Sequence, residues 1–167
     1  HDIWVFSYLA EECGVILHPG PATVELHGKT FYLAHGDGLG AKDKKFLVIR
    51  SIFHSKVCQR LFSWLHPDLG VKFGLAWAKH SRMKRKDGKE VPYQGENHEP
   101  LIRYSKQYLK EHHDIDYFIF GHRHIEIDMM ITKQTRVMVL GEWISLFTYA
   151  AFDGENMYME NYVEGDN

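Results

Sequence analysis

The chain is 167 residues long, and 44% of its residues are hydrophobic and 14% aromatic. This composition excludes an intrinsically disordered protein, and the length is sufficient for one domain with a hydrophobic core. The formal net charge of −2 argues against a protein that binds nucleic acid over a large surface. Cys13 and Cys58 have no paired spacing, so the sequence does not indicate a disulfide framework.

The first forty residues predict a short helix followed by short strands. Gly14 follows an apolar helical pattern and is placed to end it as a C-cap residue. The glycine in His27-Gly28-Lys29 lies between two β-rich runs, which is typical of a hairpin turn. The expected elements are a helix over 3–13 capped by Asp2, a strand over 15–18, and hairpin strands over 23–26 and 30–34.

The middle of the chain, from Lys44 to about Lys86, is densely apolar and has few turn residues. The pattern is too apolar for surface helices that each bury a single stripe. It predicts two helices, a corner at His66-Pro67-Asp68-Leu69-Gly70, and a third helix. The end of this third helix is basic, since residues 79–90 contain six Lys and Arg residues against two acidic residues.

The last part of the chain predicts one more helix and then strands. Apolar residues at helical spacing indicate a helix over 99–112, and the apolar run Tyr117-Phe118-Ile119-Phe120 predicts a buried strand. The remaining residues are expected to form a β-meander with strands over 127–131, 136–140, 145–152 and 157–162. Helices and strands together predict the α/β class.

Two histidines, His122 and His124, directly follow the strand predicted over 117–120. In an extended chain the side chains of residues i and i+2 point to the same side, so both imidazoles would be directed to one place. Open α/β sheets bind ligands at the carboxyl ends of their strands. Two interpretations remain: ligands for one metal ion or for two adjacent ones, or a polar strand end with solvent-exposed histidines.

Histidines next to glycine or aspartate occur in three places, in the order His1-Asp2, His35-Gly36-Asp37 and Gly121-His122-Arg123-His124. Imidazole and carboxylate groups together suit transition metals. The motifs and their order resemble those of the calcineurin-like metallophosphoesterases. The earlier motifs of that superfamily, Asp-x-His and Gly-Asp, do not precede His1-Asp2, and neither does the Gly-Asn of the third. The chain is therefore expected to be the C-terminal portion of a longer protein.

Within that superfamily the chain resembles the UDP-2,3-diacylglucosamine hydrolases. The resemblance depends on His35-Gly36-Asp37-Gly38-Leu39, the apolar and basic insertion, the Gly-His-Arg-His motif, and Gly141-Glu142-Trp143. It implies the C-terminal part of a four-layer α/β/β/α sandwich, as a single partial domain over 1–167 with a helical insertion, or lid, over 44–95. The chain departs from the pattern at His1, where many of these hydrolases carry arginine.

The resemblance also implies roles for individual residues. His35 and His122 would bind one divalent metal ion and His124 a second, with Mn²⁺ the expected metal and Zn²⁺ or Fe the alternatives. His1 would stabilise the transition state or protonate the leaving group, and Asp2 would orient His1. Paired metals polarise phosphoryl oxygens and activate water, so no serine or cysteine nucleophile is required.

The substrate of this family is a nucleotide-linked diacyl sugar, and the insertion is expected to accommodate it. Its apolar residues would form a slot for the acyl chains, and Lys79, Arg82 and Lys84 would meet the phosphates or an anionic membrane surface. Asp43 would accept hydrogen bonds from the glucosamine part. The resemblance implies a cytoplasmic protein at the inner membrane surface. The simpler interpretations are an ordinary apolar core, a solvated basic helix end, and an Asp43 that caps the next helix.

Three functions remain open at this stage. The chain belongs to a lipid A biosynthesis enzyme that cleaves UDP-2,3-diacylglucosamine to UMP and the lipid monophosphate, or to a general phosphodiesterase or phosphatase acting on a soluble substrate, or it is a non-catalytic metal-binding fragment. An apolar slot leading to His35 and His122 favours the first. Residues 1–167 alone are expected to hydrolyse little, because the metal ligands of the earlier motifs are missing.

Overall fold

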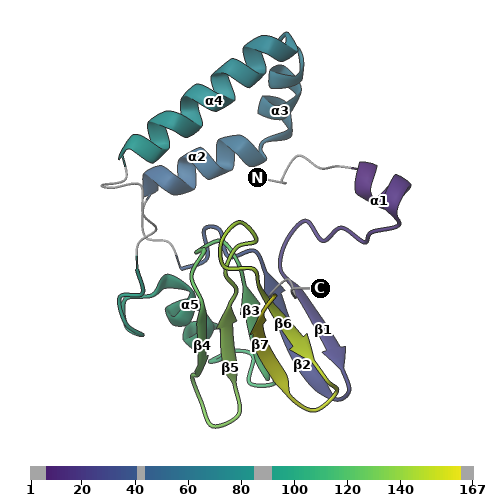
Figure 1. Cartoon of the computed structure of the whole chain (residues 1–167), viewed down its shortest axis with the longest axis vertical. Coiled ribbons are helices and arrows are strands. Elements are labelled where there is room, and N and C mark those ends of the chain that lie inside the picture. Colours follow the sequence, from purple (N-terminus) through teal and green to yellow (C-terminus); the bar gives the residue numbers. More distant parts are fainter. Residues whose placement is uncertain (1–6, 41–43, 85–91, 163–167) are drawn as a thin grey trace, which may run out of the picture. The chain divides into compact units, whose positions relative to one another are not determined.

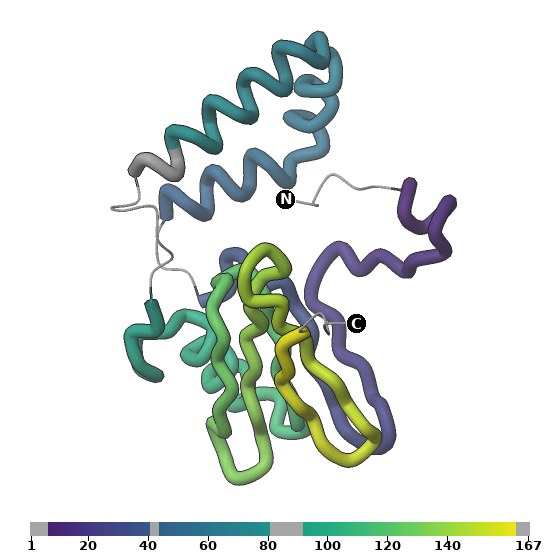
Figure 2. The backbone as a smooth tube through the Cα atoms, viewed as in Figure 1, coloured from purple at the N-terminus to yellow at the C-terminus, as the bar shows by residue number. Residues whose placement is uncertain are grey.

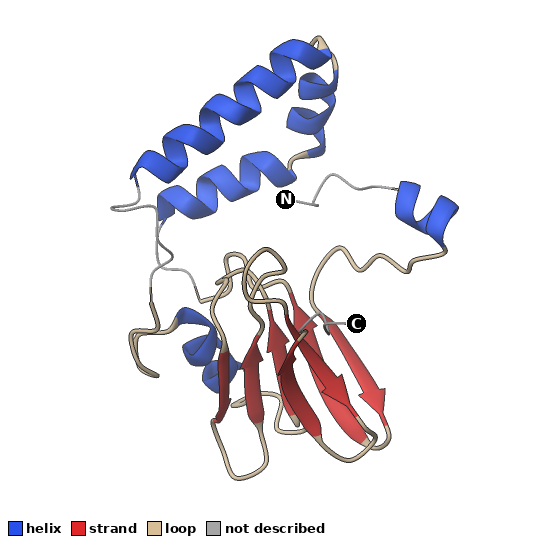
Figure 3. Ribbon diagram, in the orientation of Figure 1, coloured by secondary structure: helices blue, strands red, loops and turns tan. Residues whose placement is uncertain are grey.

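The computed structural model describes residues 7–40, 44–84 and 92–162, with only the backbone of 81–84. The chain divides into two compact units. The sheet unit comprises His18–Ala41 and Glu90–Asn167, and the helical unit comprises His1–Leu17 and Lys42–Lys89. All described strands belong to the sheet unit, drawn in red in Figure 3.

A five-stranded mixed sheet with the strand order β1-β2-β3-β5-β4 forms the centre of the sheet unit (Figure 1). The three middle strands run parallel, and β1 and β4 are antiparallel edge strands. A second, two-stranded antiparallel sheet consists of β6 and β7. The bounds are β1 (Ala22–Leu26), β2 (Lys29–Ala34), β3 (Tyr117–Phe120), β4 (Ile127–Met130), β5 (Arg136–Val139), β6 (Thr148–Phe152) and β7 (Met157–Asn161). The mixed α/β architecture confirms the predicted class.

The two faces of the five-stranded sheet are covered by different elements. Helix α5 (Pro100–Tyr108) covers one face and the β6–β7 hairpin the other. The cluster on the α5 side includes Tyr32, Leu101, Ile102, Phe118, Phe120, Val137 and Val139, and the cluster on the hairpin side consists of Phe31, Met138 and Met157. Because successive strand side chains alternate between faces, β3 needs apolar residues at every position, which explains its continuous apolar run.

The hairpin predicted at His27-Gly28 is confirmed. His27 and Gly28 both have positive φ, at 50° and 73°, as the two-residue turns that match the strand twist require. The turn of the β6–β7 hairpin lies beside it, since a Cβ on Gly154 would be 3.7 Å from Nδ1 of His27. Figure 2 shows both turns at one end of the sheet unit, which leaves the opposite end for the carboxyl ends of the parallel strands.

The predicted meander is wrong, because its two hairpins belong to different sheets. β5 pairs with β4 on one side and with β3 on the other, so both of its edges are occupied and β6 cannot join it. The strand expected over 15–18 is also wrong, since these residues form a loop without a partner strand among the described residues. The helix expected over 99–112 ends earlier, at Tyr108.

The helical unit confirms the predicted pair of helices, corner and third helix, as α2 (Lys44–His54), α3 (Lys56–Ser63) and α4 (Pro67–Lys84). Aromatic rings connect the helices: Phe53 lies 6.2 Å from Trp77 and Phe62 lies 6.4 Å from Phe73, measured between ring centroids. None of the described residues of α2 and α3 is buried. Among the described helices there is none with the length and apolar character needed to cross a bilayer.

Helix α1 (Tyr8–Cys13) also belongs to the helical unit. It begins later than the expected Ile3, with Ser7 as its N-cap residue, and Asp2 lies outside the described residues. Gly14 ends the helix as predicted, in the left-handed conformation with φ of 64°.

Candidate functional site

The motif histidines lie where two neighbouring parallel strands end. β2 pairs with β3 so that Ala34 is opposite Phe120, and His35 and Gly121 therefore leave the sheet side by side. The amide of Gly121 donates a hydrogen bond of 3.1 Å to the carbonyl oxygen of His35, which continues the strand pairing by one residue. The structure thus brings these two motif loops together at the carboxyl ends of neighbouring parallel strands.

The imidazoles of His35 and His122 lie close together, with ring centroids 5.1 Å apart and ring planes at 70°. Partial withdrawal from water lowers the pKa of His122 below its ordinary value, and neighbouring His35 lowers it further, while the charge of Asp37 opposes the shift. The ring of His122 is therefore largely neutral at neutral pH. A neutral imidazole has a free nitrogen lone pair, which is the form that binds a metal ion.

The loop that carries His122 and His124 is not extended, so one expectation from the sequence is wrong. The amide of Arg123 donates a 2.7 Å hydrogen bond to the carbonyl of Gly121, which closes a three-residue turn around His122. His122 and His124 both have positive φ, at 65° and 49°. A turn of this kind with a positive central φ is rare and strained. The two imidazoles therefore do not follow the alternation of a strand.

The described part of the chain contains no group of three or more His, Cys, Asp or Glu side chains placed to hold one metal ion. The structure brings together His35 and His122, and His124 is near enough to contribute to the lowered pKa of His122. Two imidazoles at this spacing, one of them held neutral, suit a metal of the borderline class. The donors available here fit part of a metal site.

Arg123, between the two motif histidines, forms a bidentate ion pair with Glu99. Its Nε lies 2.8 Å from Oε1 of Glu99, and its Nη2 lies 3.1 Å from Oε2. Glu99 is 1% exposed and precedes the first residue of α5. A carboxylate at this depth requires a partner of opposite charge, and the planar guanidinium provides one with matching geometry.

The loop after β2 is packed on the first turns of the same helix. A Cβ on Gly36 would lie 3.3 Å from both Cδ atoms of Leu101, and a Cβ on Gly40 would lie 2.3 Å from the carbonyl oxygen of Pro100. Arg103 donates a 3.1 Å hydrogen bond from Nη2 to the carbonyl of Gly40. Glycine at position 40 is thus required both for its φ of 66° and for this close approach.

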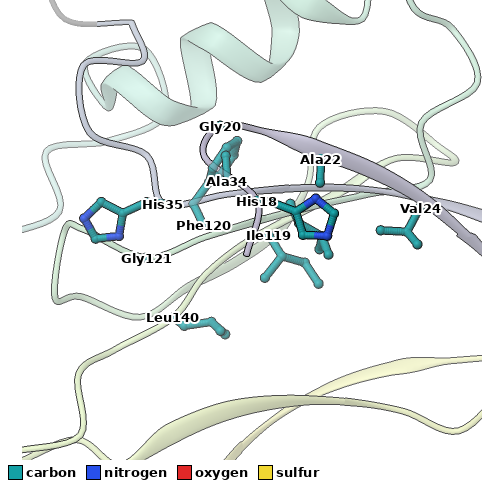
Figure 4. Close-up of a pocket in the computed structure, with 11 residues that line it drawn as sticks. His18, Gly20, Ala22, Val24, Ala34, His35, Ile119, Phe120, Gly121 and Leu140 are labelled. Atoms are coloured by element: carbon teal, nitrogen blue, oxygen red, sulfur yellow. The ribbon is translucent and has the colours of Figure 1, made fainter. Parts of the chain in front are cut away.

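A pocket of about 350 Å³ adjoins His35 on the hairpin-facing side of the sheet. Figure 4 shows His35 at one end of this pocket and Val24 at the other, with His18 and Ile119 between them. Most of the lining side chains are apolar, and Leu140 contributes from the carboxyl end of β5. The pocket lies entirely within the sheet unit.

Comparisons with known proteins give one consistent result. The chain is 34% identical over 171 residues to the UDP-2,3-diacylglucosamine hydrolase of Porphyromonas gingivalis (strain ATCC BAA-308 / W83), with 96% of this chain and 65% of that protein covered. The enzymes of the same name from Yersinia pseudotuberculosis (serotype O:1b, strain IP 31758) and Yersinia pestis (bv. Antiqua, strain Angola) are 29% identical over 148 residues, covering 85% of this chain and 58% of theirs. No family model matches the chain.

The chain is related in sequence to the UDP-2,3-diacylglucosamine hydrolases over nearly all of its length. This confirms the resemblance given by the sequence motifs. The chain spans less than two thirds of the length of these UDP-2,3-diacylglucosamine hydrolases.

The other residues expected to act in a UDP-2,3-diacylglucosamine hydrolase lie elsewhere. Lys79 lies on α4 in the helical unit, as do Arg82 and Lys84, whose side chains are not described. His1, Asp2 and Asp43 lie outside the described residues. The roles predicted for these six residues stay predictions.

Sequence reasoning missed Glu99. Its position just before Pro100 is typical of a solvent-exposed helix start, and nothing in its neighbourhood indicates a buried ion pair. The signal that was available is Arg123, because an arginine between two motif histidines needs a carboxylate partner where it is withdrawn from water.

Proposed function

We propose that the protein carrying this chain is a metal-dependent hydrolase that cleaves the pyrophosphate of UDP-2,3-diacylglucosamine, and that this chain supplies part of its two-metal centre. The observation that carries the proposal is the facing pair of His35 and His122 at the carboxyl ends of adjacent parallel strands. The family relationship supports the substrate, since the relatives are named for it. The products would be UMP and the diacylated sugar phosphate of lipid A biosynthesis.

His35 and His122 would hold one divalent ion and His124 a second, with Mn²⁺ the proposed metal and Zn²⁺ or Fe the alternatives. The lowered pKa of His122 supports this assignment, because the ring does not need to lose a proton at neutral pH before it binds. The bound ions would supply Lewis-acid polarisation of the phosphoryl oxygens and activation of water. His1, oriented by Asp2, would protonate the leaving group or stabilise the transition state.

The remaining structural parts of the proposal concern the fold and the lid. We infer that the sheet unit is the C-terminal part of a four-layer sandwich in one partial domain over 1–167, and that residues 44–95 form a lid for the acyl chains. The support is apolar exposure: many large apolar side chains of the helical unit are exposed, among them Val48, Val57, Trp64, Leu75 and Trp77. Such surface favours contact with acyl chains or with the surface of the inner membrane, on its cytoplasmic side.

Lys79, Arg82 and Lys84 would bind the phosphates or anionic lipid, and Asp43 the glucosamine. Lys79 is exposed on α4, which is consistent with a role at a phosphate or lipid surface. Each basic side chain near an anionic lipid surface contributes about 1 kcal/mol of binding free energy.

The test is hydrolysis by the protein that carries this chain, followed by ³¹P NMR detection of UMP and the lipid phosphate. With Mn²⁺ and UDP-2,3-diacylglucosamine we expect turnover that EDTA abolishes and added Mn²⁺ restores. His122→Ala should lower kcat by on the order of 100-fold or more, because a ligand is lost. His113→Ala, an exposed histidine outside the motifs, is the matched control and should leave kcat unchanged.

Two outcomes would replace the proposal. Faster hydrolysis of bis(p-nitrophenyl) phosphate than of the diacylated nucleotide indicates a phosphodiesterase for soluble substrates. Mn²⁺ binding without turnover of either compound indicates a non-catalytic metal-binding protein.

A further inference from the structure

The starting observation is that the turn around His122 is strained. His122 and His124 are both in the left-handed region of φ, and the Arg123 amide closes the turn on the carbonyl of Gly121. Residues with a Cβ adopt this conformation at a cost, so the turn persists only where its surroundings enforce it. Some contact must therefore hold residues 121–124 in place.

An ion pair between Arg123 and Glu99 connects this turn to the start of α5. Both guanidinium-to-carboxylate bonds are present, Glu99 is 1% exposed, and the Arg123 side chain is 18% exposed. Two parallel bonds to a planar guanidinium fix its orientation as well as its distance. The ion pair therefore ties the Arg123 side chain to a carboxylate that is buried at the start of α5.

Glu99 occupies the N-cap position of α5 but forms no side-chain cap hydrogen bond. Residues at this position normally bind the exposed amides of the first helical turn with their side chains. The Glu99 carboxylate instead reaches Arg123, which is 24 residues away in sequence. The Glu99 side chain thus forms a long-range ion pair in place of a local cap hydrogen bond. Such departures from local preference are typical of functional sites.

The same end of α5 also holds the loop that carries His35. Leu101 packs against Gly36, and Arg103 donates a hydrogen bond to the carbonyl of Gly40. One helix start thus contacts both loops whose imidazoles face each other. The spacing of His35 and His122 depends on this helix as well as on the sheet.

We propose that Glu99 is a positioning residue, which acts through Arg123 to hold the strained turn at His122 and His124 in the geometry that binds metal. The proposal rests on the proposed function for the identity of the ligand. It does not place Glu99 or Arg123 in contact with the metal ion or the substrate.

The test compares the protein that carries this chain with its Glu99→Gln variant. Mn²⁺ binding is measured from the electron paramagnetic resonance signal of free Mn²⁺, and amide hydrogen exchange of residues 121–124 is measured without metal. We expect an affinity 10- to 100-fold weaker in the variant, as for other outer-shell partners of metal ligands, and faster exchange of the Arg123 amide. Glu96→Gln is the matched control, because Glu96, just before α5, forms a partly exposed ion pair with Lys106, which lies away from the histidine loops in the sequence. The control should leave both readouts unchanged.

Arg123→Lys provides a second variant if Glu99→Gln does not fold. Lysine keeps the charge opposite Glu99 but loses the two-bond geometry, so the fold should be retained while Mn²⁺ affinity still falls. Equal affinity and equal amide exchange in the folded variants and the parent chain would overturn the proposal.

The two proposals fail separately in this experiment. If the parent protein that carries this chain binds no Mn²⁺, the metal assignment is overturned. The exchange rates of residues 121–124 then still decide whether Glu99 holds the turn. If the parent protein binds Mn²⁺ and the Glu99→Gln variant binds it equally tightly, only the positioning role of Glu99 is overturned.

Discussion

Tyr32 is the residue whose protonation most clearly couples to the fold. Its side chain is 3% exposed, and its hydroxyl lies 2.6 Å from that of Tyr104. Burial raises the pKa of Tyr32 well above the ordinary value near 10, and the hydrogen bond to Tyr104 adds to the shift. Above pH 10 the folded protein keeps a proton that the unfolded chain loses. Stability is therefore retained below pH 10 and lost as the pH rises beyond it.

Tyr32→Phe should reveal this coupling. At pH 8 the variant is expected to be less stable by about 1 kcal/mol, because one hydrogen bond is lost. Near pH 10.5 to 11 the difference in unfolding free energy between the parent chain and the variant should shrink by about 1 kcal/mol. Only the parent chain has Tyr32, which ionises on unfolding at this pH. Urea unfolding at both pH values measures the two differences. A difference that stays constant would contradict the raised pKa.

At the level of single residues, the sequence predicted where His35 and His122 lie and missed what holds them there. Both histidines were predicted at strand ends because each follows an apolar run, which is a local signal. The strained turn at His122 was not predicted, because the ion pair that supports it joins Arg123 to Glu99, which lies 24 residues away in the sequence. Local patterns do not record tertiary support of this kind.

Among the elements, α5 has the closest contact with the candidate site. Gly40→Ala tests this contact, because the added Cβ would lie 2.3 Å from the carbonyl oxygen of Pro100 at the start of the helix. Gly28→Ala is the matched control, since Gly28 has a similar φ of 73° but no atom within 4 Å of such a Cβ.

Both glycine variants should lose about 1 kcal/mol for the left-handed conformation. Gly40→Ala should lose a further 1 to 3 kcal/mol, roughly, because backbone must move to relieve the overlap. Urea unfolding gives both values. Equal losses in the two variants would show that the loop after β2 is not packed tightly on α5.

The helices and hairpins were predicted well where local signals decide them. Gly14 and the His27-Gly28 turn are examples, since both need a left-handed residue at a defined place. The assignment of β6 and β7 to a separate sheet was not predictable, because it follows from the occupied edges of β5. Sheet membership is set by pairing partners that a strand's own residues do not identify.

For the whole molecule, burial predicts different local stabilities in the two units. Phe118, Val137 and Val139 in the sheet unit are fully buried, whereas the described residues of α2 and α3 include no buried one. Segments with few buried apolar contacts open at low free-energy cost. We expect backbone amides of α2 and α3 to exchange with deuterium on the order of 100-fold faster than those of β3 and β5.

Anionic phospholipid vesicles should reduce this difference if the helical unit serves as a lid for acyl chains. Lipid would cover the exposed side chains of Val57, Trp64 and Leu75. Opening of the helices would then also require these side chains to leave the lipid, which raises the free energy of opening. Exchange in α2 and α3 should slow while exchange in β3 and β5 stays unchanged, which provides an internal control in a single mass-spectrometry experiment. Equal protection of both units without lipid would contradict the burial argument, and unchanged helical exchange with lipid would contradict the lid.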